Sequence, residues 1–250
     1  MTAENTVVVA VDGSDAAKNA VRWAANTASK RGVPLRIASS YTMPQFLQAE
    51  TMSIVEEAKK IAEEINPDLK IAYTIAEGTP IDMLLELSET NKMIVMGSRG
   101  LGGLSGMVMG SVSAAVVSHA HCPVVVVRED NHLTEENKYG PVVVGVDGSD
   151  VSQQATEFAF AEADARGAKI EAIHTWIDMQ VQASLAGLAA AQQEWKVVEE
   201  EQTQLLQERL APLLEQYPNV DVDMVITRDR PIRALVDAAK HAQLLVVGSH

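Results

Sequence analysis

The sequence predicts two consecutive α/β domains, each built on a doubly wound parallel sheet. Short apolar runs such as VVVAV at 7–11 and VVVV at 124–127 are apolar on both faces, which is typical of strands buried inside a parallel sheet. Segments of helical length separate these runs, and that alternation predicts a doubly wound domain. The pattern VVVAVDGSD at 7–15 returns as VVVGVDGSD at 142–150, so the unit is present twice.

The first copy begins with a strand and then a helix, whose N-cap we expect at Ser14 or Asp15. Five strands and four helices alternate along this copy. The expected strands span 6–12, 35–41, 69–76, 93–97 and 123–128, and the expected helices span 15–31, 49–65, 80–90 and 110–120.

In doubly wound sheets, ligands bind beyond the carboxyl ends of the strands, where the strand order reverses. Asp12, the segment after Tyr41 and the loop after Gly97 all lie at that edge of the predicted sheet. We therefore expect three separate segments to converge on one site.

The spacing of the repeat divides the chain. The first strand, turn and helix recur 135 positions later without a gap. The Pro80-Ile81 pair recurs 151 positions later, as Pro231-Ile232, so the second copy holds 16 additional residues before this pair. We expect a first domain, a linker and a second domain, at 1–130, 131–140 and 141–250.

The second copy departs from the first near its end. Gly97 and Ser98 recur as Gly248 and Ser249, but no counterpart of residues 100–128 follows. The second domain therefore lacks its last loop, helix and strand, and we interpret the sequence as a fragment.

Composition excludes several classes of protein. The 250 residues carry a net charge of −14, which would repel nucleic acid phosphates. No apolar run approaches a membrane span, and the N-terminus lacks the pattern of a signal peptide. Cys122 is the single cysteine, which excludes an internal disulfide and fits a reducing compartment. We expect a cytoplasmic protein that binds neither nucleic acid nor a membrane.

The loop GSRGLGGLSGMVMGS at 97–111 follows an apolar strand. Glycine permits positive φ and the close approach of a phosphate, and N–H groups at a helix start attract the anion. The loop is not a P-loop, because G-x-x-x-x-G-K-[ST] is absent, and Ser105 interrupts the G-x-G-x-x-G of dinucleotide folds. The predicted ligand is a nucleotide phosphate, and the alternative is a glycine-rich connection without a ligand.

Three segments resemble one known family: VVVAVDGSD at 7–15, the spacing G-x2-G-x9-G-S at 97–111, and HAHCPVVVV at 119–127. Over its whole length the chain resembles universal stress proteins of the ATP-binding branch, in the tandem two-domain form of mycobacteria and related actinobacteria. The resemblance implies a Rossmann-like fold of the adenine nucleotide alpha hydrolase-like type. It also implies a role as an ATP-dependent regulator of stress or dormancy.

The resemblance further implies which residues hold the nucleotide. Ala10 and Asp12 face the ribose and the metal-phosphate region, and the backbone near Met43 meets the adenine edge. The phosphates are held by the loop and the following helix start, through Gly97, Ser98, Arg99, Gly100, Leu101, Gly102, Gly103, Gly110, Ser111 and Val112. The corresponding positions of the second copy are Gly145, Asp147, Asp178 and Gly248. Only the first site is complete, so we expect one ATP per chain.

Of two groups of potential metal ligands, only one is expected to bind a metal ion. A carboxylate beside a triphosphate normally needs a divalent cation between them, so Asp12 and ATP imply Mg²⁺. His119, His121 and Cys122 lack a partner pair, so they are not expected to bind a metal ion.

Segment 180–217 contains most of the additional residues of the second copy. Its large apolar residues have near-helical spacing and predict a helix packed on the core, with a partner-binding face as the alternative. These residues are Leu185, Leu188, Trp195, Val198, Leu205, Leu206 and Leu210. Gly187 is a plausible break in that helix, which we expect to lie over the second nucleotide cleft.

Two function classes stay open on the sequence. In the first, ATP stabilises one conformation or assembly of a regulator by binding it preferentially. In the second, the chain is a weak ATPase or another nucleotide-cleaving enzyme, which would need a base and a cation near the phosphates. The loop offers Arg99 and little else, so we favour binding. AMP or cyclic AMP is the alternative ligand, and a homodimer and an unknown regulatory protein are the expected partners.

Overall fold

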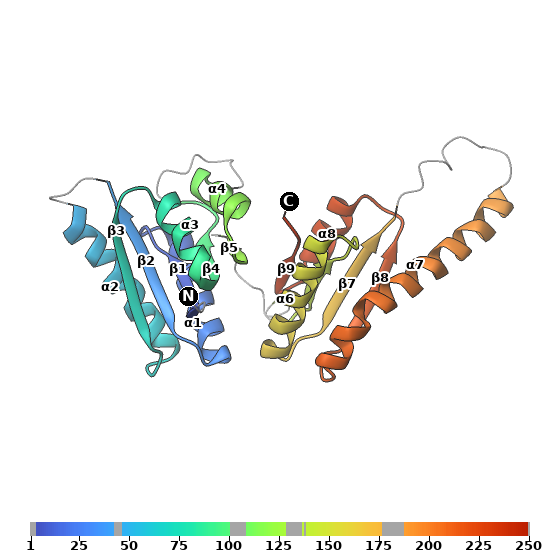
Figure 1. The fold of residues 1–250 in the computed structure, drawn as a ribbon, viewed down its shortest axis with the longest axis horizontal. Helices are drawn as coiled ribbons and strands as arrows, with labels where there is room; N and C mark the ends of the chain where they lie inside the picture. Colours follow the sequence, from blue (N-terminus) through green and yellow to red (C-terminus); the bar gives the residue numbers. More distant parts are fainter. Residues whose placement is uncertain are drawn as a thin grey trace. The chain divides into compact units, whose positions relative to one another are not determined.

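The computed structural model describes residues 4–42, 47–100, 109–128, 137, 139–176 and 188–249 (Figure 1). The chain divides into two compact units, Met1–His132 and Leu133–His250. Each unit is described below by itself.

The first unit is a five-stranded parallel sheet with strand order β3-β2-β1-β4-β5. Its strands are β1 (Glu4–Ala10), β2 (Leu35–Tyr41), β3 (Ile71–Glu77), β4 (Asn91–Gly97) and β5 (Val124–Val127). Its helices are α1 (Asp15–Arg31), α2 (Leu47–Ile65), α3 (Pro80–Thr90) and α4 (Ser111–His119). The order confirms the doubly wound prediction, because the chain builds outward from β1 in one direction and then returns to β4 on its other side.

Local sequence sets the helix starts in this unit. Ser14 is the N-cap of α1, and its hydroxyl accepts a hydrogen bond from the Ala17 N–H at 3.2 Å. Thr79 caps α3 in the same way, with Pro80 in the first turn. Strand β1 ends two residues earlier than predicted, since Gly13 has φ of +87° and turns the chain toward α1. Asp12 therefore lies in a loop and not in the strand.

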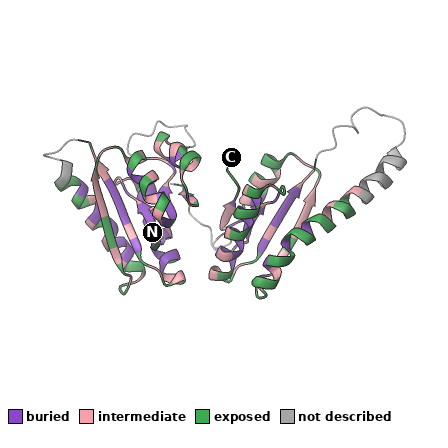
Figure 2. Cartoon of the chain, in the orientation of Figure 1, coloured by how far each residue is buried: buried purple, intermediate pink, exposed green. Residues whose placement is uncertain are grey.

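Helices cover both faces of the first sheet, with α1 and α2 on one face and α3 and α4 on the other (Figure 1). Val7 and Val9 are buried, and Val8 packs on the opposite face against Leu84 and Val116. The central strands are accordingly buried (Figure 2). A strand that is apolar on both faces fits this three-layer arrangement.

The second unit repeats the plan with a four-stranded parallel sheet among the described residues, in the order β8-β7-β6-β9. Its strands are β6 (Val142–Gly145), β7 (Ile170–Thr175), β8 (Val222–Thr227) and β9 (Leu244–Val246). Its helices are α6 (Asp150–Arg166), α7 (Leu188–Gln216) and α8 (Pro231–Ala239). One face of this sheet packs on α6 and α7, and the other face packs on α8.

Helix α7 confirms most of the predicted core packing that can be examined. Leu206 and Leu210 are each 1% exposed and join the core beneath α6 and α7. Leu205 is 42% exposed, so its placement in the apolar stripe is wrong. Adjacent helical residues point about 100° apart, and Leu206 takes the inward position. Val198 is half-buried, whereas Leu185, Gly187 and the side chains of Leu188 and Trp195 lie outside the described part.

No helix within the described ranges combines the length and the hydropathy needed to cross a membrane.

The second unit contains a buried ionic network. The Glu162 carboxylate accepts hydrogen bonds from Arg166, at 2.7 Å from Nη2 and 2.8 Å from Nε. The two side chains are 1% and 8% exposed. Oε1 of Gln243 accepts a hydrogen bond from Nη1 of Arg166 at 3.4 Å. Nε2 of Gln243 donates to the Gly140 carbonyl at 2.7 Å. The network thus ties the end of α6 to the segment before β9 and to the entry of β6.

We expect Glu162→Ala to destabilise the second unit by about 3–5 kcal/mol, because it leaves the Arg166 guanidinium buried without its counter-ion. Urea unfolding monitored in the second unit measures this change. Lys59→Ala is the control, since it breaks an exposed pair with Glu63 on α2 and should change stability by about 0.5 kcal/mol or less. Equal effects of both substitutions would contradict the assignment.

Candidate functional site

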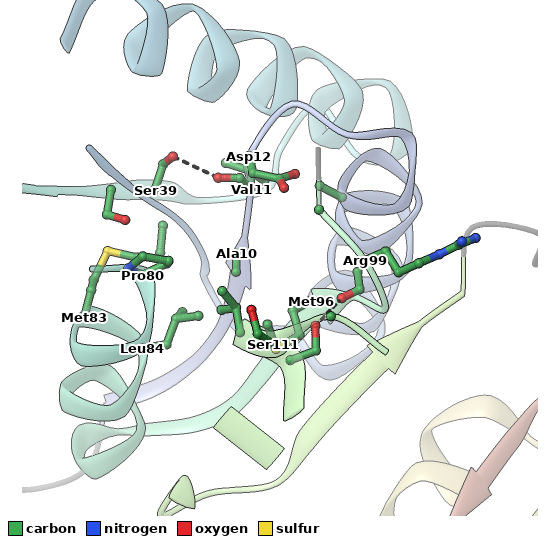
Figure 3. Close-up of a pocket in the computed structure, with 18 of the residues that line it drawn as sticks. Ala10, Val11, Asp12, Ser39, Pro80, Met83, Leu84, Met96, Arg99 and Ser111 are labelled. Atoms are coloured by element: carbon green, nitrogen blue, oxygen red, sulfur yellow. Dashed lines mark hydrogen bonds between the residues drawn. The ribbon is translucent and has the colours of Figure 1, made fainter. Parts of the chain in front are cut away.

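A cleft of about 600 Å³ lies at the carboxyl ends of β1, β2 and β4 (Figure 3). The site is therefore at the switch point of the sheet, between β1 and β4, as the sequence predicts. Its volume falls within the range of small-molecule sites in proteins. The walls come from the β1–α1 turn, from β2, α2 and α3, and from the segments on either side of the glycine loop.

Asp12 stands at the mouth of the cleft, in the turn that starts α1. Its Oδ1 accepts a hydrogen bond from the Ser14 N–H at 3.0 Å, which fixes the orientation of the carboxylate. Its Oδ2 lies next to Gly100, where a Cβ would collide with it. The loop after β4 and the turn after β1 therefore meet at this carboxylate.

Gly97 is explained by packing and not by a special backbone conformation. A Cβ at this position would lie 2.9 Å from the backbone carbon and from the Cβ of Ala16, closer than real side chains come. None of Gly97, Gly100 and Gly110 has a positive φ. The expectation that these glycines supply positive φ is thus wrong for the described ones, because at Gly97 and Gly100 the need is for room beside a neighbour.

The start of α4 closes the opposite side of the cleft. Gly110 is its N-cap and supplies no side-chain cap, while the Gly110 N–H donates to the Ser98 carbonyl at 2.7 Å. The Ser113 hydroxyl donates to the Gly97 carbonyl at 2.9 Å and ties the helix to β4. The first N–H groups of a helix have no partner within the helix, so the backbone at Ser111 and Val112 presents donors to the cleft.

The rest of the cleft is largely apolar. Ala10, Met83, Leu84 and Met96 line it from β1, α3 and β4. The hydroxyls of Ser39 and Thr51 lie on the α2 side, and the Ser39 hydroxyl donates to the Val11 carbonyl at 2.8 Å. An apolar slot that leads to a helix N-terminus suits a ligand with a flat apolar part and an anionic part.

Most of the site residues inferred for the first domain line this cleft. Those that line it are Ala10, Asp12, Gly97, Arg99, Gly100, Gly110, Ser111 and Val112. Ser98 is buried and does not line it, because its backbone pairs with Val127 and Gly110 instead. Met43, Leu101, Gly102 and Gly103 lie outside the described residues.

Sequence reasoning missed several lining residues. Met83 belongs to α3, which begins with the repeated Pro-Ile pair, and this repeat was the available signal for it. Ser39 and Thr51 carried no comparable pattern.

In the second unit, the corresponding residues keep the local geometry. The Asp147 carboxylate accepts hydrogen bonds from the Ser149 N–H at 2.9 Å and from its hydroxyl at 2.7 Å. A Cβ at Gly248 would lie 2.9 Å from Val151, so this glycine packs against α6 as Gly97 packs against α1. A Cβ at Gly145 would lie 3.2 Å from a methyl group of Leu235. Asp178 is outside the described residues.

Reactive groups are few in the described part of the cleft. Asp12 and Arg99 are the charged residues of the described lining, and Arg99 extends away from Ala10 and Leu84 in Figure 3. Among the described residues, no three His, Cys, Asp or Glu side chains are grouped to hold a metal ion. Burial raises the pKa of the Cys122 thiol to about 11, so this cysteine is protonated at neutral pH.

Comparisons with known proteins cover the whole chain. The model of the universal stress protein family matches residues 4–128 and 138–250. Universal stress protein Rv2005c of Mycobacterium tuberculosis is 38% identical over 264 residues, which cover 99% of this chain and 88% of that protein. Universal stress protein Rv1996 of the same organism is 37% identical over 281 residues, which cover 100% and 88%.

One solved structure that covers nearly the whole chain has the same fold. A universal stress protein from Archaeoglobus fulgidus is 16% identical and covers 98% of both chains, with a TM-score of 0.58. A universal stress protein solved in complex with cAMP is 31% identical, covers 52% of this chain and 100% of that one, and has a TM-score of 0.44.

We expect Gly97→Ala to destabilise the first unit by about 1–3 kcal/mol, since the new Cβ forces α1 away from β4. Gly110→Ala is the matched control. A Cβ there meets its nearest neighbours at an ordinary 3.6 Å, and alanine is only a poorer N-cap, so the loss should stay below about 1 kcal/mol. Thermal unfolding of both variants measures the difference, and a Gly97→Ala variant as stable as the control would show that α1 and β4 are not held by this contact.

Proposed function

The chain belongs to the universal stress protein family, and from this premise we propose that its first domain binds ATP as a regulatory ligand. The observation that carries the proposal is the N-terminus of α4, which has no side-chain cap and opens into the same cleft as the apolar slot of Ala10, Met83 and Leu84. One end of the cleft thus suits a nucleobase and the other suits phosphates.

The parts of the cleft take different roles in this proposal. The apolar slot receives the nucleoside, with the backbone near Met43 at the adenine edge and Ala10 near the ribose. The N–H groups at Ser111 and Val112, with the glycine loop, hold the phosphates. Gly100 and Gly110 leave room for the phosphate chain, which a Cβ at either position would narrow.

Mg²⁺ would accompany the triphosphate. Asp12 is the one described carboxylate that lines the cleft, and its Oδ2 faces the loop that would hold the phosphates. Mg²⁺ is commonly held by one or two carboxylates together with phosphate oxygens and water, so a single carboxylate suffices. The cation would neutralise the repulsion between Asp12 and the phosphates.

We favour a regulator over an efficient enzyme. A ligand that binds one conformation preferentially stabilises that conformation, and this requires no chemical step. Hydrolysis needs a positioned base and a cation on the transferred phosphate, whereas the described lining offers Asp12, which holds the Ser14 N–H, and an outward-directed Arg99. Weak ATP hydrolysis and binding of AMP or cyclic AMP are the alternatives within the same site.

Assembly and location complete the proposal. Strand β5 is the edge of its sheet and presents the backbone of Val124–Val127, which fits self-association into a homodimer. We place the protein in the cytoplasm, with a regulatory protein as a further partner.

The proposal is tested by ATP titration in a calorimeter, together with identification of any nucleotide that the purified protein releases on acid denaturation. We expect ATP to bind and to be released intact. Gly100→Ala or Gly110→Ala should weaken binding at least about tenfold, because the added Cβ narrows the phosphate path.

The Gly110→Ala variant carries the cleaner result, because its fold should be close to that of the wild type. Unchanged affinity in both variants would remove the phosphate role of the loop. Release of ADP with rapid formation of phosphate would favour the enzyme instead.

We further expect Asp12→Asn to reduce the affinity for ATP in the presence of Mg²⁺ and to have little effect without it. The substitution removes the negative charge but keeps the shape, and an amide is a poor Mg²⁺ ligand. Titration of the wild type and the variant with ATP, with and without Mg²⁺, measures the affinity under both conditions. Equal losses under the two conditions would show that Asp12 acts through the Ser14 N–H and not through a cation.

A further inference from the structure

The two domains differ at an equivalent position on their second strands. Ser39 on β2 and His174 on β7 occupy equivalent places of the repeat, and each bonds to the carbonyl that follows the first strand of its own domain. The Ser39 hydroxyl donates to the Val11 carbonyl at 2.8 Å, and Nδ1 of His174 lies 2.6 Å from the Val146 carbonyl oxygen. The same anchor therefore holds a small side chain in the first domain and an imidazole in the second.

At a second position too, the side chain is larger in the second domain than in the first. Thr51 on α2 also lines the first cleft, and its equivalent, at the 151-residue spacing of the Pro-Ile pair, is Gln202 on α7. The Gln202 carboxamide reaches across to His174, with Oε1 3.0 Å from Nε2. His174 is 9% exposed and is held on both ring nitrogens. In the second domain the side chains at these two positions are therefore in contact.

Further side chains lie against two glycines of the second domain. Leu235 packs on Gly145, whose counterpart in the first domain is Ala10. Arg209 on α7 lies over Gly148, at the start of α6, where a Cβ would collide with its guanidinium. In the first domain the equivalent Gly13 is approached by the aliphatic Ile54. Leu235 repeats Leu84, which lines the first cleft, so the difference between the two domains lies in α7, which carries Arg209 over Gly148.

We infer that His174 and Gln202 fill the space that Ser39 and Thr51 leave open for the nucleoside, so that the second domain excludes an adenine nucleotide by volume. The inference rests on the proposed function of the first domain. It assigns the choice between a binding and a non-binding domain to two residue positions.

Titration with AMP distinguishes a nucleoside pocket that is filled by side chains from a pocket that only lacks contacts to the terminal phosphates. A domain that only lacks contacts to terminal phosphates would still bind AMP, whereas a filled nucleoside pocket binds neither AMP nor ATP. The full chain is titrated with ATP and with AMP in a calorimeter, and the number of bound molecules is counted. We expect one molecule per chain for each nucleotide.

A double variant of the first domain, Ser39→His/Thr51→Gln, then carries the two larger side chains of the second domain. We call it the filled variant. The new imidazole can use the Val11 carbonyl, so the fold is expected to persist, and its unfolding temperature checks this. ATP affinity should fall at least about tenfold. If the double variant does not fold, Thr51→Gln alone serves. Lys60→Gln places the same side chain on the exposed face of α2 and is the matched control, with unchanged affinity.

Each outcome decides the inference. One bound AMP and a loss of affinity confined to the filled variant support it. Two bound AMP molecules per chain, or a folded filled variant with wild-type affinity, overturn it while leaving the proposed function intact. A third overturning result is that Ser39→Ala/Thr51→Val loses as much affinity as the filled variant, because the hydroxyls and not the volume would then matter. A wild-type chain that binds no nucleotide refutes the proposed function, and this inference falls with it.

Discussion

The contact between the end of β4 and the start of α1 is the constraint on which the cleft depends. Gly97 lies so close to Ala16 that no side chain fits between them, and the chain leaves β4 directly beside the Asp12 turn. Gly100 lies against the same turn, and the N-terminus of α4 is tied to the end of β4 through the Gly97 and Ser98 carbonyls. Gly248 and Val151 repeat the contact in the second unit.

Sequence patterns predicted the fold well because the relevant signals are local or repeated. Two-sided apolar runs identify parallel strands, and Ser14 and Thr79 mark helix starts through bonds within one turn. Strand β1 was extended too far, since Val11 continues the apolar pattern although Gly13 already turns the chain. The exposure of Leu205 depends on the rotation of α7, which spacing alone does not fix.

The site was only partly predictable, because its walls come from segments far apart in the sequence. Gly100 and Gly110 stand out as glycines, but the collision partner of Gly100 is Asp12, 88 residues earlier. Ser39 and Thr51 belong to no motif, and only the folded β2 and α2 bring them to one cleft. The difference between Ser39 and His174 is visible in the repeat, but the contact of His174 with Gln202 on α7 is seen only in the folded structure.

The network around Glu162 also bears on how the chain folds as it is synthesised. The first unit has all five strands of its sheet once Val127 has been made, so it can fold while the second is still being translated. In the second unit, Gln243 joins Arg166 to Gly140, and β9 pairs directly with β6. Strand β6 therefore gains its pairing with β9 only after the residues of β9 have been made. Until residues 243–246 have been made, the first domain can fold while the second still lacks the contact of Gln243 with Arg166 and the pairing of β6 with β9.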